Sequence, residues 1–372
     1  MHIVQIVPTI GPGSGVAGVA WNLDREFTRL GVTTETITYS MTSPPRSIRQ
    51  RGPFTARLAN MQRVVFFSTR GSRFARRFLA ERPDAVSICH NDAMVGDIYV
   101  NHGVLHAAMR ARGMVALRYL RNPTHIFTHV RDRRRYRGST HRVIVALADT
   151  EAAALRRAYG KVHPPVVVIP NGVDLDRFHP PTPEERRSAR ASLGLGDDER
   201  VVVFVGHEFD RKGLPLLLQA MPHAPEALLL VVGGDPRQIA AARRQAQAVG
   251  VLERVHFVGR QSDVVPFLHA ADMFALPSAY EANALALLEA LAAGLPVIAT
   301  AVGGAAIAVS EGEAGFLVPP DAGVIGERMN LLINEDLAPW RARARSSAAR
   351  FSWTCIAQHY LDLAQRVAFE RG

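Results

Sequence analysis

The chain has 372 residues, of which 48% are hydrophobic and 21% are charged, a composition typical of globular proteins and unlike that of disordered or fibrous chains. This length is suited to two domains of ordinary size. The two cysteines, Cys89 and Cys355, exclude a disulfide framework and a cysteine-based zinc site, and so few cysteines are typical of a reducing compartment.

The net charge of +10 is unevenly distributed along the chain. Residues 1–170 hold 25 Lys+Arg against 10 Asp+Glu, for a net +15, whereas residues 171–372 hold 19 against 24, for a net −5. The two halves are therefore expected to face different partners. Arginine dominates the basic residues, since Lys161 and Lys212 are the two lysines of the chain.

Short apolar strands alternate with helical stretches along the whole chain, which predicts an α/β fold with two parallel sheets. The N-terminus is interpreted as a first strand and not as a signal peptide. Strands of the first half are expected at residues 2–7, 34–38, 85–89, 97–100, 142–147 and 166–169. Strands of the second half are expected at residues 201–205, 227–232, 255–258, 273–276 and 297–299.

A turn and a polar run divide these two sets of strands. The turn Ile-Pro-Asn-Gly-Val-Asp ends at Asp174, and charged residues follow as far as Arg200. We therefore expect one domain over residues 1–170 and a second over residues 171–350, with a linker near 171–199. Residues 351–372 are predicted to form a separate amphipathic helix, with apolar residues at helical spacing: Ile356, Tyr360, Leu363 and Val367.

The uncharged stretch 290–310 is long enough to cross a membrane. Pro296 and several glycines interrupt it, so it is predicted to form a helix, a turn, a short buried strand and another turn.

A glycine-rich loop follows the first predicted strand. Residues 13–18 match the pattern G-x-G-x-x-G, but residues 8–12 separate them from the strand, and this disfavours the tight turn of a dinucleotide site. The loop is instead interpreted as an anion-binding loop of small residues at a helix N-terminus. Its backbone N–H groups would bind the anion, and that of Gly15 is one of them. The alternative is a loop with a purely structural role.

Two cations follow the first strand of the second half. Arg211 and Lys212 stand before Gly213 at the carboxyl edge of the predicted sheet, where open α/β folds bind ligands. A guanidinium fork and a compact ammonium group suit a diphosphate. The alternative, a solvated surface lysine, is weakened by the scarcity of lysine in this chain.

Two glutamates, Glu281 and Glu289, flank the start of a predicted helix. Glu289 stands among leucines and alanines, and such a carboxylate is a good acceptor for sugar hydroxyls. The free N–H groups of residues 283–285 at the helix start would suit a phosphate. Alternatively, Glu281 is only a helix cap and Glu289 only lies at the edge of an amphipathic helix.

Taken together, these motifs resemble the family-4 retaining glycosyltransferases of the GT-B fold (glycosyltransferase group 1). The resemblance covers nearly the whole chain and includes Gly-x-Pro-Val at residues 294–297. It implies two Rossmann-like domains facing each other across a cleft, with a C-terminal helix crossing back to the first domain. The first domain would bind the acceptor and the second the nucleotide-sugar donor.

The resemblance also implies a role for each candidate site residue. The two catalytic residues would be His102, which follows a strand, and Glu281, both at the donor sugar. Residues for the remaining parts of the donor would be Asn283 for the sugar, Glu289 for the ribose, Val258, Gly259 and Arg260 for the base, and Gly15, Arg211, Lys212, Ala284 and Leu285 for the diphosphate. The chain departs from the family pattern at His207, where an Arg is common, and at Asn283, Ala284 and Ile307, so the resemblance does not identify the sugar.

The implied activity is a retaining, metal-independent hexosyl transfer that needs no cofactor besides the nucleotide sugar, with UDP as the favoured nucleotide. The histidine pairs at His102 and His106 and at His125 and His129 have no carboxylate close in sequence to complete a metal site. A nicotinamide oxidoreductase is disfavoured by the glycine loop. A nucleic-acid-binding protein is disfavoured because aromatic residues make up 7% of the chain and no binding module is recognisable.

Two arginine-rich segments, residues 57–77 and 131–137, indicate where the acceptor binds. The first alternates Arg with Phe, Val and Leu, as a basic amphipathic surface helix does. The sequence-based hypothesis is a cytoplasmic enzyme, peripheral on the anionic inner face of the membrane, whose acceptor is a lipid-linked or envelope glycan. Its candidate membrane face consists of Arg70, Arg73, Arg76 and Arg77. The alternatives are a soluble small-molecule acceptor and a non-catalytic protein that binds nucleotides or a membrane surface.

Overall fold

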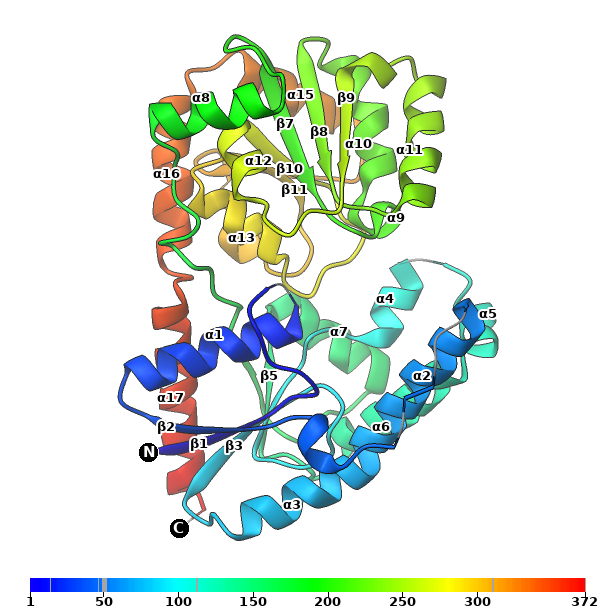
Figure 1. The fold of residues 1–372 in the computed structure, drawn as a ribbon, viewed down its shortest axis with the longest axis vertical. Helices are drawn as coiled ribbons and strands as arrows, with labels where there is room; N and C mark the ends of the chain where they lie inside the picture. The colour runs from blue at the N-terminus through cyan, green and yellow to red at the C-terminus, as the bar shows by residue number, and fades with distance from the viewer. Residues whose placement is uncertain (14, 46, 49–51, 112, 310, 372) are drawn as a thin grey trace. The chain divides into compact units, whose positions relative to one another are not determined.

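The computed structural model describes residues 1–371 except 14, 46, 49–51, 112 and 310. The chain divides into two compact units (Figure 1). Unit 1 comprises Met1–Gly172 and Trp353–Gly372, and unit 2 comprises Val173–Ser352.

Unit 1 is built on a six-stranded parallel sheet of order β2-β1-β3-β4-β5-β6. Its strands are β1 (His2–Ile6), β2 (Thr33–Ile37), β3 (Ala85–His90), β4 (Ile98–Val100), β5 (Val143–Ala146) and β6 (Val166–Val168). Every residue of β3, β4 and β5 is buried, because helices cover both faces of a parallel sheet and leave no face for water.

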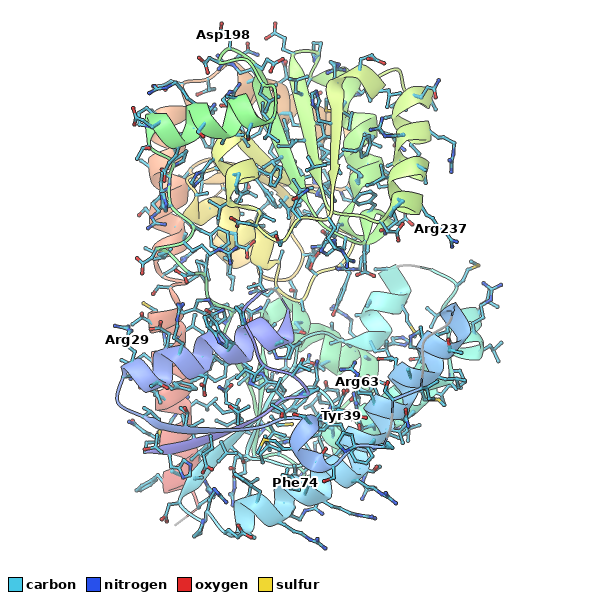
Figure 2. The ribbon with its side chains drawn as sticks, viewed as in Figure 1. Arg29, Tyr39, Arg63, Phe74, Asp198 and Arg237 are labelled. Carbon is cyan, nitrogen blue, oxygen red and sulfur yellow. The ribbon has the colours of Figure 1, made fainter. Side chains whose placement is uncertain are left out.

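The helices of unit 1 include a distorted segment. They are α1 (Val16–Arg29), α2 (Pro53–Phe66), α3 (Ser72–Ala80), α4 (Leu105–Ala111), α5 (Val115–Arg121), α6 (Pro123–Arg137), α7 (Asp149–Tyr159) and α17 (Trp353–Phe369). A π-helical turn, η2 (Phe67–Gly71), joins α2 to α3, so the predicted amphipathic helix over residues 57–77 is two helices. Phe67 is fully buried at this turn, beneath the ring of Tyr39, which Figure 2 labels.

Helix α17 comes from the far end of the chain and belongs to unit 1. The four apolar residues singled out by their helical spacing, Ile356 to Val367, are all buried. At the start of the helix, Thr354 donates a hydrogen bond of 3.0 Å to Glu26 of α1 and accepts one of 2.7 Å from Arg29. The predicted crossover helix is thereby confirmed, with its apolar face packed in unit 1.

Unit 2 contains a second parallel sheet, of order β12-β11-β10-β7-β8-β9. Its strands are β7 (Arg200–Val205), β8 (Ala227–Val232), β9 (Val255–Gly259), β10 (Met273–Leu276), β11 (Val297–Thr300) and β12 (Gly315–Val318). The sequence analysis missed β12, which has four residues and pairs with β11 at the edge of the sheet.

Nine helices of unit 2 surround this sheet in the described part of the chain. They are α8 (Pro183–Ser192), α9 (Phe209–Lys212), α10 (Leu214–Ala220), α11 (Pro236–Ala248), α12 (Val265–Ala270), α13 (Leu285–Ala292), α14 (Ala305–Ala308), α15 (Ala322–Ile333) and α16 (Leu337–Ala349). The uncharged stretch 290–310 contributes to α13 and β11, as predicted, and also to the short helix α14, where the sequence analysis expected a turn. Within the described ranges, no helix combines the length and apolar character needed to cross a membrane.

Candidate active site

The loops at the carboxyl edge of the unit 2 sheet approach one another closely because glycines stand at the points of contact. A Cβ atom on Gly206, which follows β7, would lie 2.2 Å from Cδ of Lys212. A Cβ atom on Gly233, which follows β8 with a φ of +117°, would lie 2.1 Å from the carbonyl oxygen of Gly206. These backbones therefore come together at the edge where open α/β sheets bind their ligands.

Glu281 is the centre of charge at this edge, and its side chain is 9% exposed. Lys212 Nζ lies 2.9 Å and Arg211 Nη1 3.1 Å from its Oε1 atom. Ser278 Oγ donates to the same oxygen at 3.3 Å. Among the described residues these contacts all engage Oε1, so Oε2 keeps its capacity to accept hydrogen bonds.

The two cations reach Glu281 because α9 is a single helical turn. Gly213 ends this turn with a φ of +83°, and a Cβ atom there would lie 1.9 Å from the carbonyl oxygen of Pro277. Arg211 also donates to the carbonyl oxygen of Tyr280 at 2.6 Å and to Glu208 at 2.7 Å. The sequence analysis expected two cations and a carboxylate at this edge, but it did not foresee their direct contact or the part of Ser278.

Glu289 lies in the last part of α13 and is half-buried. Burial raises the pKa of its carboxyl group to about 7, although the positive charges of Arg177 and Lys212 act against this rise. Arg177 itself forms an exposed ion pair of 2.8 Å with Asp263. Near neutral pH the Glu289 carboxyl group is therefore present in both protonation states.

The remaining donor candidates of unit 2 lie at loop and helix ends. Ala284 caps the N-terminus of α13 without a side-chain hydrogen bond, and Leu285 is the first helical residue. Asn283 packs against Gly304, where a Cβ atom would lie 2.6 Å from its Nδ2 atom. The backbone of Gly259, at the end of β9, accepts a hydrogen bond of 2.7 Å from the N–H of Gly233.

Val258 and Arg260 flank Gly259, and Arg260 is exposed. Partial burial, together with the charges of Arg260 and Lys212, lowers the pKa of His207. His207, which stands where the family commonly has Arg, is therefore neutral at physiological pH.

In unit 1 the glycine loop folds back onto the first turn of α1. Gly15 caps this helix with a φ of +80°, and a Cβ atom on Gly18 would lie 1.8 Å from the carbonyl oxygen of Gly13. Residue 14 of the motif lies outside the described residues. Only glycine fits at position 18, because the loop backbone touches the helix there.

His102 follows β4 and belongs to a chain of hydrogen bonds within unit 1. Its Nε2 atom lies 3.0 Å from Nδ1 of His90, whose Nε2 atom lies 3.1 Å from Oε1 of Gln5. Burial lowers the pKa of His102 to about 4 and lowers the pKa of His90 well below its usual value, so both imidazoles are neutral at physiological pH. The sequence analysis missed His90 and Gln5, although Gln5 is the one polar residue between Ile3 and Val7 in an apolar strand.

Two family models match consecutive parts of the chain. Residues 13–177 match the model described as Glycosyltransferase Family 4, and residues 185–351 match the model described as Glycosyl transferases group 1. The chain belongs to the group 1/family 4 glycosyltransferases.

Curated relatives of this chain carry the name "D-inositol 3-phosphate glycosyltransferase". The protein of Mycobacterium sp. (strain KMS) is 41% identical over 192 residues, which are 50% of this chain and 43% of that protein. The protein of Xylanimonas cellulosilytica is 35% identical over 232 residues, or 59% of this chain and 56% of that protein. The matched regions thus span about half the length of these relatives.

Solved structures share the GT-B fold with this chain. Sucrose-phosphate synthase from Thermosynechococcus elongatus superposes with a TM-score of 0.75 at 23% identity, covering 100% of both chains. WaaG, a glycosyltransferase involved in lipopolysaccharide biosynthesis, has a TM-score of 0.75 at 22% identity and covers 97% of this chain and 99% of its own. HepE from Anabaena in complex with UDP-glucose has a TM-score of 0.69 at 18% identity, covering 98% and 99%. The predicted fold of two Rossmann-like domains is confirmed.

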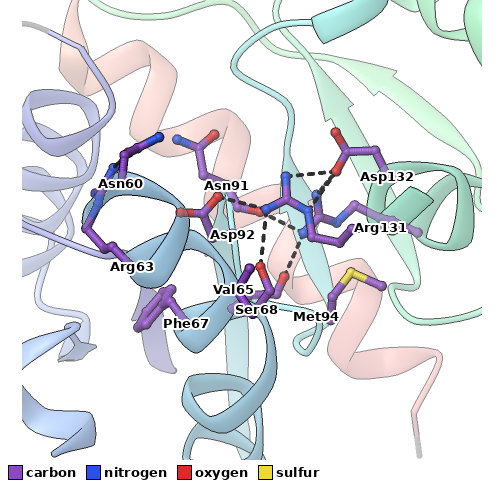
Figure 3. A network of polar contacts seen from close by, with 12 residues as sticks. Asn60, Arg63, Val65, Phe67, Ser68, Asn91, Asp92, Met94, Arg131 and Asp132 are labelled. Atoms are coloured by element: carbon purple, nitrogen blue, oxygen red, sulfur yellow. Dashed lines mark hydrogen bonds and ion pairs between the residues drawn. The ribbon is translucent and has the colours of Figure 1, made fainter. Parts of the chain in front are cut away.

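Two arginines of the arginine-rich segment 131–137, Arg131 and Arg135, form ion pairs inside unit 1, whereas Arg133, Arg134 and Arg137 are exposed, so only part of the segment adds to a basic surface. Figure 3 shows Arg131 between Asp92 and Asp132, at 2.8 and 2.9 Å. Arg135 is fully buried and donates to Asp132 and to the carbonyl oxygens of Asn91 and Ala93. These two side chains neutralise buried carboxylates and hold the loop that follows β3.

The arginines of the candidate membrane face lie at the surface, whereas the phenylalanines near them in sequence pack against the core of unit 1. Arg70, Arg73, Arg76 and Arg77 are all exposed, three of them on α3. Phe74, labelled in Figure 2, and Phe78 stack on each other and pack against the core of unit 1. The phenylalanines that the sequence analysis assigned to a lipid-facing surface therefore stabilise the unit itself.

Proposed function

We propose that this chain transfers a sugar from a nucleoside diphosphate sugar to an acceptor hydroxyl, with unit 2 binding the donor. The convergence of Arg211 and Lys212 on one oxygen of Glu281 carries this proposal. It gathers two cations and a carboxylate with spare acceptor capacity at the ligand-binding edge of the sheet. A diphosphate suits the cations, and the hydroxyls of the attached sugar suit the carboxylate.

The proposed mechanism is retaining and needs no metal ion. The bond between the anomeric carbon and the diphosphate breaks, and the acceptor oxygen forms its new bond on the same face of the sugar. The acceptor proton passes to the departing phosphate oxygen. Arg211, Lys212 and the backbone N–H groups at Ala284 and Leu285 stabilise the negative charge as it develops, which is the role that a metal ion has in other transferases.

The other donor contacts follow the family resemblance. Glu281 and Asn283 bind the sugar, Glu289 binds the ribose hydroxyls, and residues 258–260 contact the base. Gly15 and His102 of unit 1 contribute a phosphate contact and a sugar contact. UDP is the proposed nucleotide. The support from HepE, whose structure contains UDP-glucose, is that it shares the fold of this chain.

For the acceptor, the relatives favour a small soluble molecule over the lipid-linked or envelope glycan that the arginine-rich segments indicated. Their shared name specifies inositol 3-phosphate, a phosphorylated polyol. A cavity of about 240 Å³ in unit 1 supports an anionic acceptor. Its lining residues include two arginines, whose guanidinium groups would suit a phosphate, and are Arg57, Met114, Leu117, Arg121, Asn122 and His125.

The experiment is a matrix of donors and acceptors. UDP-, GDP- and ADP-sugars are each incubated with inositol, with inositol 3-phosphate or with a polyprenyl phosphate, and the nucleoside diphosphate released is measured. We expect release from a UDP-sugar that depends on inositol 3-phosphate and is far weaker with inositol. Release that requires the polyprenyl phosphate would favour a lipid-linked acceptor instead. If no donor binds and none releases its nucleoside diphosphate, the proposed activity is contradicted.

A peripheral location at the inner face of the membrane remains a second proposal, supported by the four exposed arginines of residues 70–77. With Phe74 and Phe78 packed against the core of unit 1, this binding would rest on charge. A cytoplasmic location follows from the proposed use of a nucleotide sugar and from the small number of cysteines.

A further inference from the structure

Three side chains of unit 1 form a directed line of hydrogen bonds that ends at His102. Gln5 and His90 are both fully buried, in β1 and at the end of β3. The line starts at the carbonyl oxygen of Ala20 in α1, which lies 3.0 Å from Nε2 of Gln5. It continues through Gln5 Oε1, at 3.1 Å from His90, and His90 Nδ1, at 3.0 Å from His102.

The carbonyl oxygen of Ala20 determines which atom donates in each hydrogen bond from Gln5 to His102. A backbone carbonyl oxygen can only accept, so the amide nitrogen of Gln5 faces Ala20 and its oxygen faces His90. His90 must then carry its proton on Nε2, and because its ring is neutral, Nδ1 is an acceptor. His102 must therefore donate from Nε2, which leaves the lone pair on its own Nδ1 atom.

The surroundings keep this line in place. Asp24 Oδ1 lies 3.4 Å from Nε2 of Gln5 and favours the same orientation of the amide. On the other side of His90, Arg135 donates hydrogen bonds of 2.7 and 2.8 Å to the loop that follows β3. Among the described residues, Nδ1 of the half-buried His102 has no hydrogen-bond partner.

We propose that Gln5 and His90 are positioning residues that hold His102 as the Nε2-protonated tautomer, so that its Nδ1 atom accepts a hydrogen bond from a ligand hydroxyl. A neutral acceptor atom of this kind does not bind a phosphate, whose oxygens are acceptors too. The partner of His102 is thus a sugar hydroxyl and not the diphosphate. This assignment of the ligand rests on the proposed function, whereas the tautomer does not.

The tautomer can be measured on the unmodified chain of 372 residues. Two-bond ¹⁵N–¹H correlation spectra of histidine-labelled protein separate protonated from unprotonated ring nitrogens, and His102→Asn and His90→Asn spectra assign the signals. We expect His90 and His102 to carry the proton on Nε2. His141 is the internal control with the opposite tautomer, because its Nδ1 atom lies 2.9 Å from the carbonyl oxygen of Gly96. A proton on Nδ1 of His102 would overturn the proposal.

Two matched substitutions test the role of Gln5. Gln5→Glu keeps both hydrogen bonds when its buried carboxyl group is protonated, since the hydroxyl then donates to Ala20 and the other oxygen accepts from His90, and this variant should keep the tautomer of His102. Gln5→Met keeps the side-chain length but removes the acceptor, so His102 should become a mixture of tautomers while His141 is unchanged. An unchanged His102 signal in folded Gln5→Met protein would show that Gln5 does not set the tautomer. If this variant fails to fold, the wild-type spectrum still shows which ring nitrogen of His102 carries the proton.

A functional comparison tests the hydroxyl. With a series of monodeoxy UDP-sugars, the wild type should lose about tenfold in kcat/KM for one of them, and His102→Phe should lose that discrimination while still using the donor. Equal discrimination in both proteins would overturn the sugar contact. If the wild type uses no nucleotide sugar at all, the proposed function fails, but the spectra still decide the tautomer.

Discussion

Lys212 Nζ lies 2.9 Å from Glu281 Oε1, and Arg211 shares the same oxygen. The two proposed phosphate ligands are thus held by the proposed sugar ligand. A bound diphosphate would draw the cations toward itself, and Glu281 would then be free to accept from sugar hydroxyls. On the proposed function, donor binding would therefore be coupled to the contacts of this carboxylate.

Replacing Lys212 by Ala should weaken UDP binding by about 1.5 to 3 kcal/mol, the contribution of a charge-assisted hydrogen bond. Isothermal titration calorimetry measures it. Lys161→Ala is the matched control, because Lys161 is the other lysine of the chain and is exposed in unit 1. Equal affinities for UDP in the two variants would remove Lys212 from the diphosphate site.

Glu281→Gln and Glu289→Gln should separate two kinds of donor contact. Contacts to the sugar tighten in the transition state, so Glu281→Gln should mainly lower kcat, whereas Glu289→Gln should mainly raise the donor KM. Steady-state kinetics with the best UDP-sugar measure both. The assigned roles are wrong if the two variants show the same change in kcat and KM.

The pH dependence of donor binding should report on Glu289, whose pKa is raised to about 7. The charged carboxylate is the better acceptor for ribose hydroxyls, so donor affinity should increase as pH rises from 6 to 8. Affinity measured across this range should become flat in Glu289→Gln. A wild-type profile without an inflection near neutral pH would contradict the role of this group.

The same shift makes a prediction for stability. Because the pKa of Glu289 is raised on folding, its protonated form favours the folded state, and that contribution is fully present below the unfolded pKa of about 4.3. It is lost as pH rises through about 7. Denaturant unfolding should thus show stability falling between these values more steeply in the wild type than in Glu289→Gln, and equal slopes would place the carboxyl group in water.

Arg135→Met should destabilise the protein by about 3 to 5 kcal/mol, because it leaves two carbonyl oxygens without their buried donor and removes one of the two arginines that pair with Asp132. Arg134→Met is the control, since this neighbouring side chain is exposed and should cost less than about 0.5 kcal/mol. Urea unfolding monitored by circular dichroism measures both. Similar midpoints for the two variants would mean that the network in Figure 3 contributes little.

Vesicle co-sedimentation tests the membrane face. Binding that rests on arginines alone should appear on anionic vesicles at low salt and be absent on neutral vesicles. It should disappear at moderate salt, because the Debye length becomes shorter. Changing Arg70, Arg73, Arg76 and Arg77 together to Gln should abolish it. Binding that survives moderate salt would instead require an apolar insertion that Phe74 and Phe78 do not provide.

Much of the architecture could be predicted because both sheets are parallel and buried, so their strands are short apolar runs between turns. Eleven of the twelve strands, from β1 to β11, were located in this way. Strand β12 was missed because its four residues follow a loop of small and acidic residues, Glu311 to Ala314, with no helix signal before them. Local pattern alone does not separate such an edge strand from a loop.

The polar partners within each unit could not be predicted, since they depend on which loops meet in space. Arg131 looks like a surface arginine in sequence because it stands among five other charged residues, yet Asp92 from a distant loop faces it. His90 likewise lies 12 residues before His102, and only the pairing of β3 with β4 brings the two rings together. The periodicity of a sequence indicates which side chains are buried, but it does not indicate which residue a buried polar side chain contacts.

Unit 1 takes its residues from both ends of the chain, whereas unit 2 is continuous. When a ribosome has made residue 352, the sequence of unit 2 is complete, but the side of α1 that receives α17 is still bare. Unit 2 can therefore finish folding first, and unit 1 must wait for the last segment to be released. A circular permutant that begins at Val173 would make unit 1 continuous as well and would remove this wait.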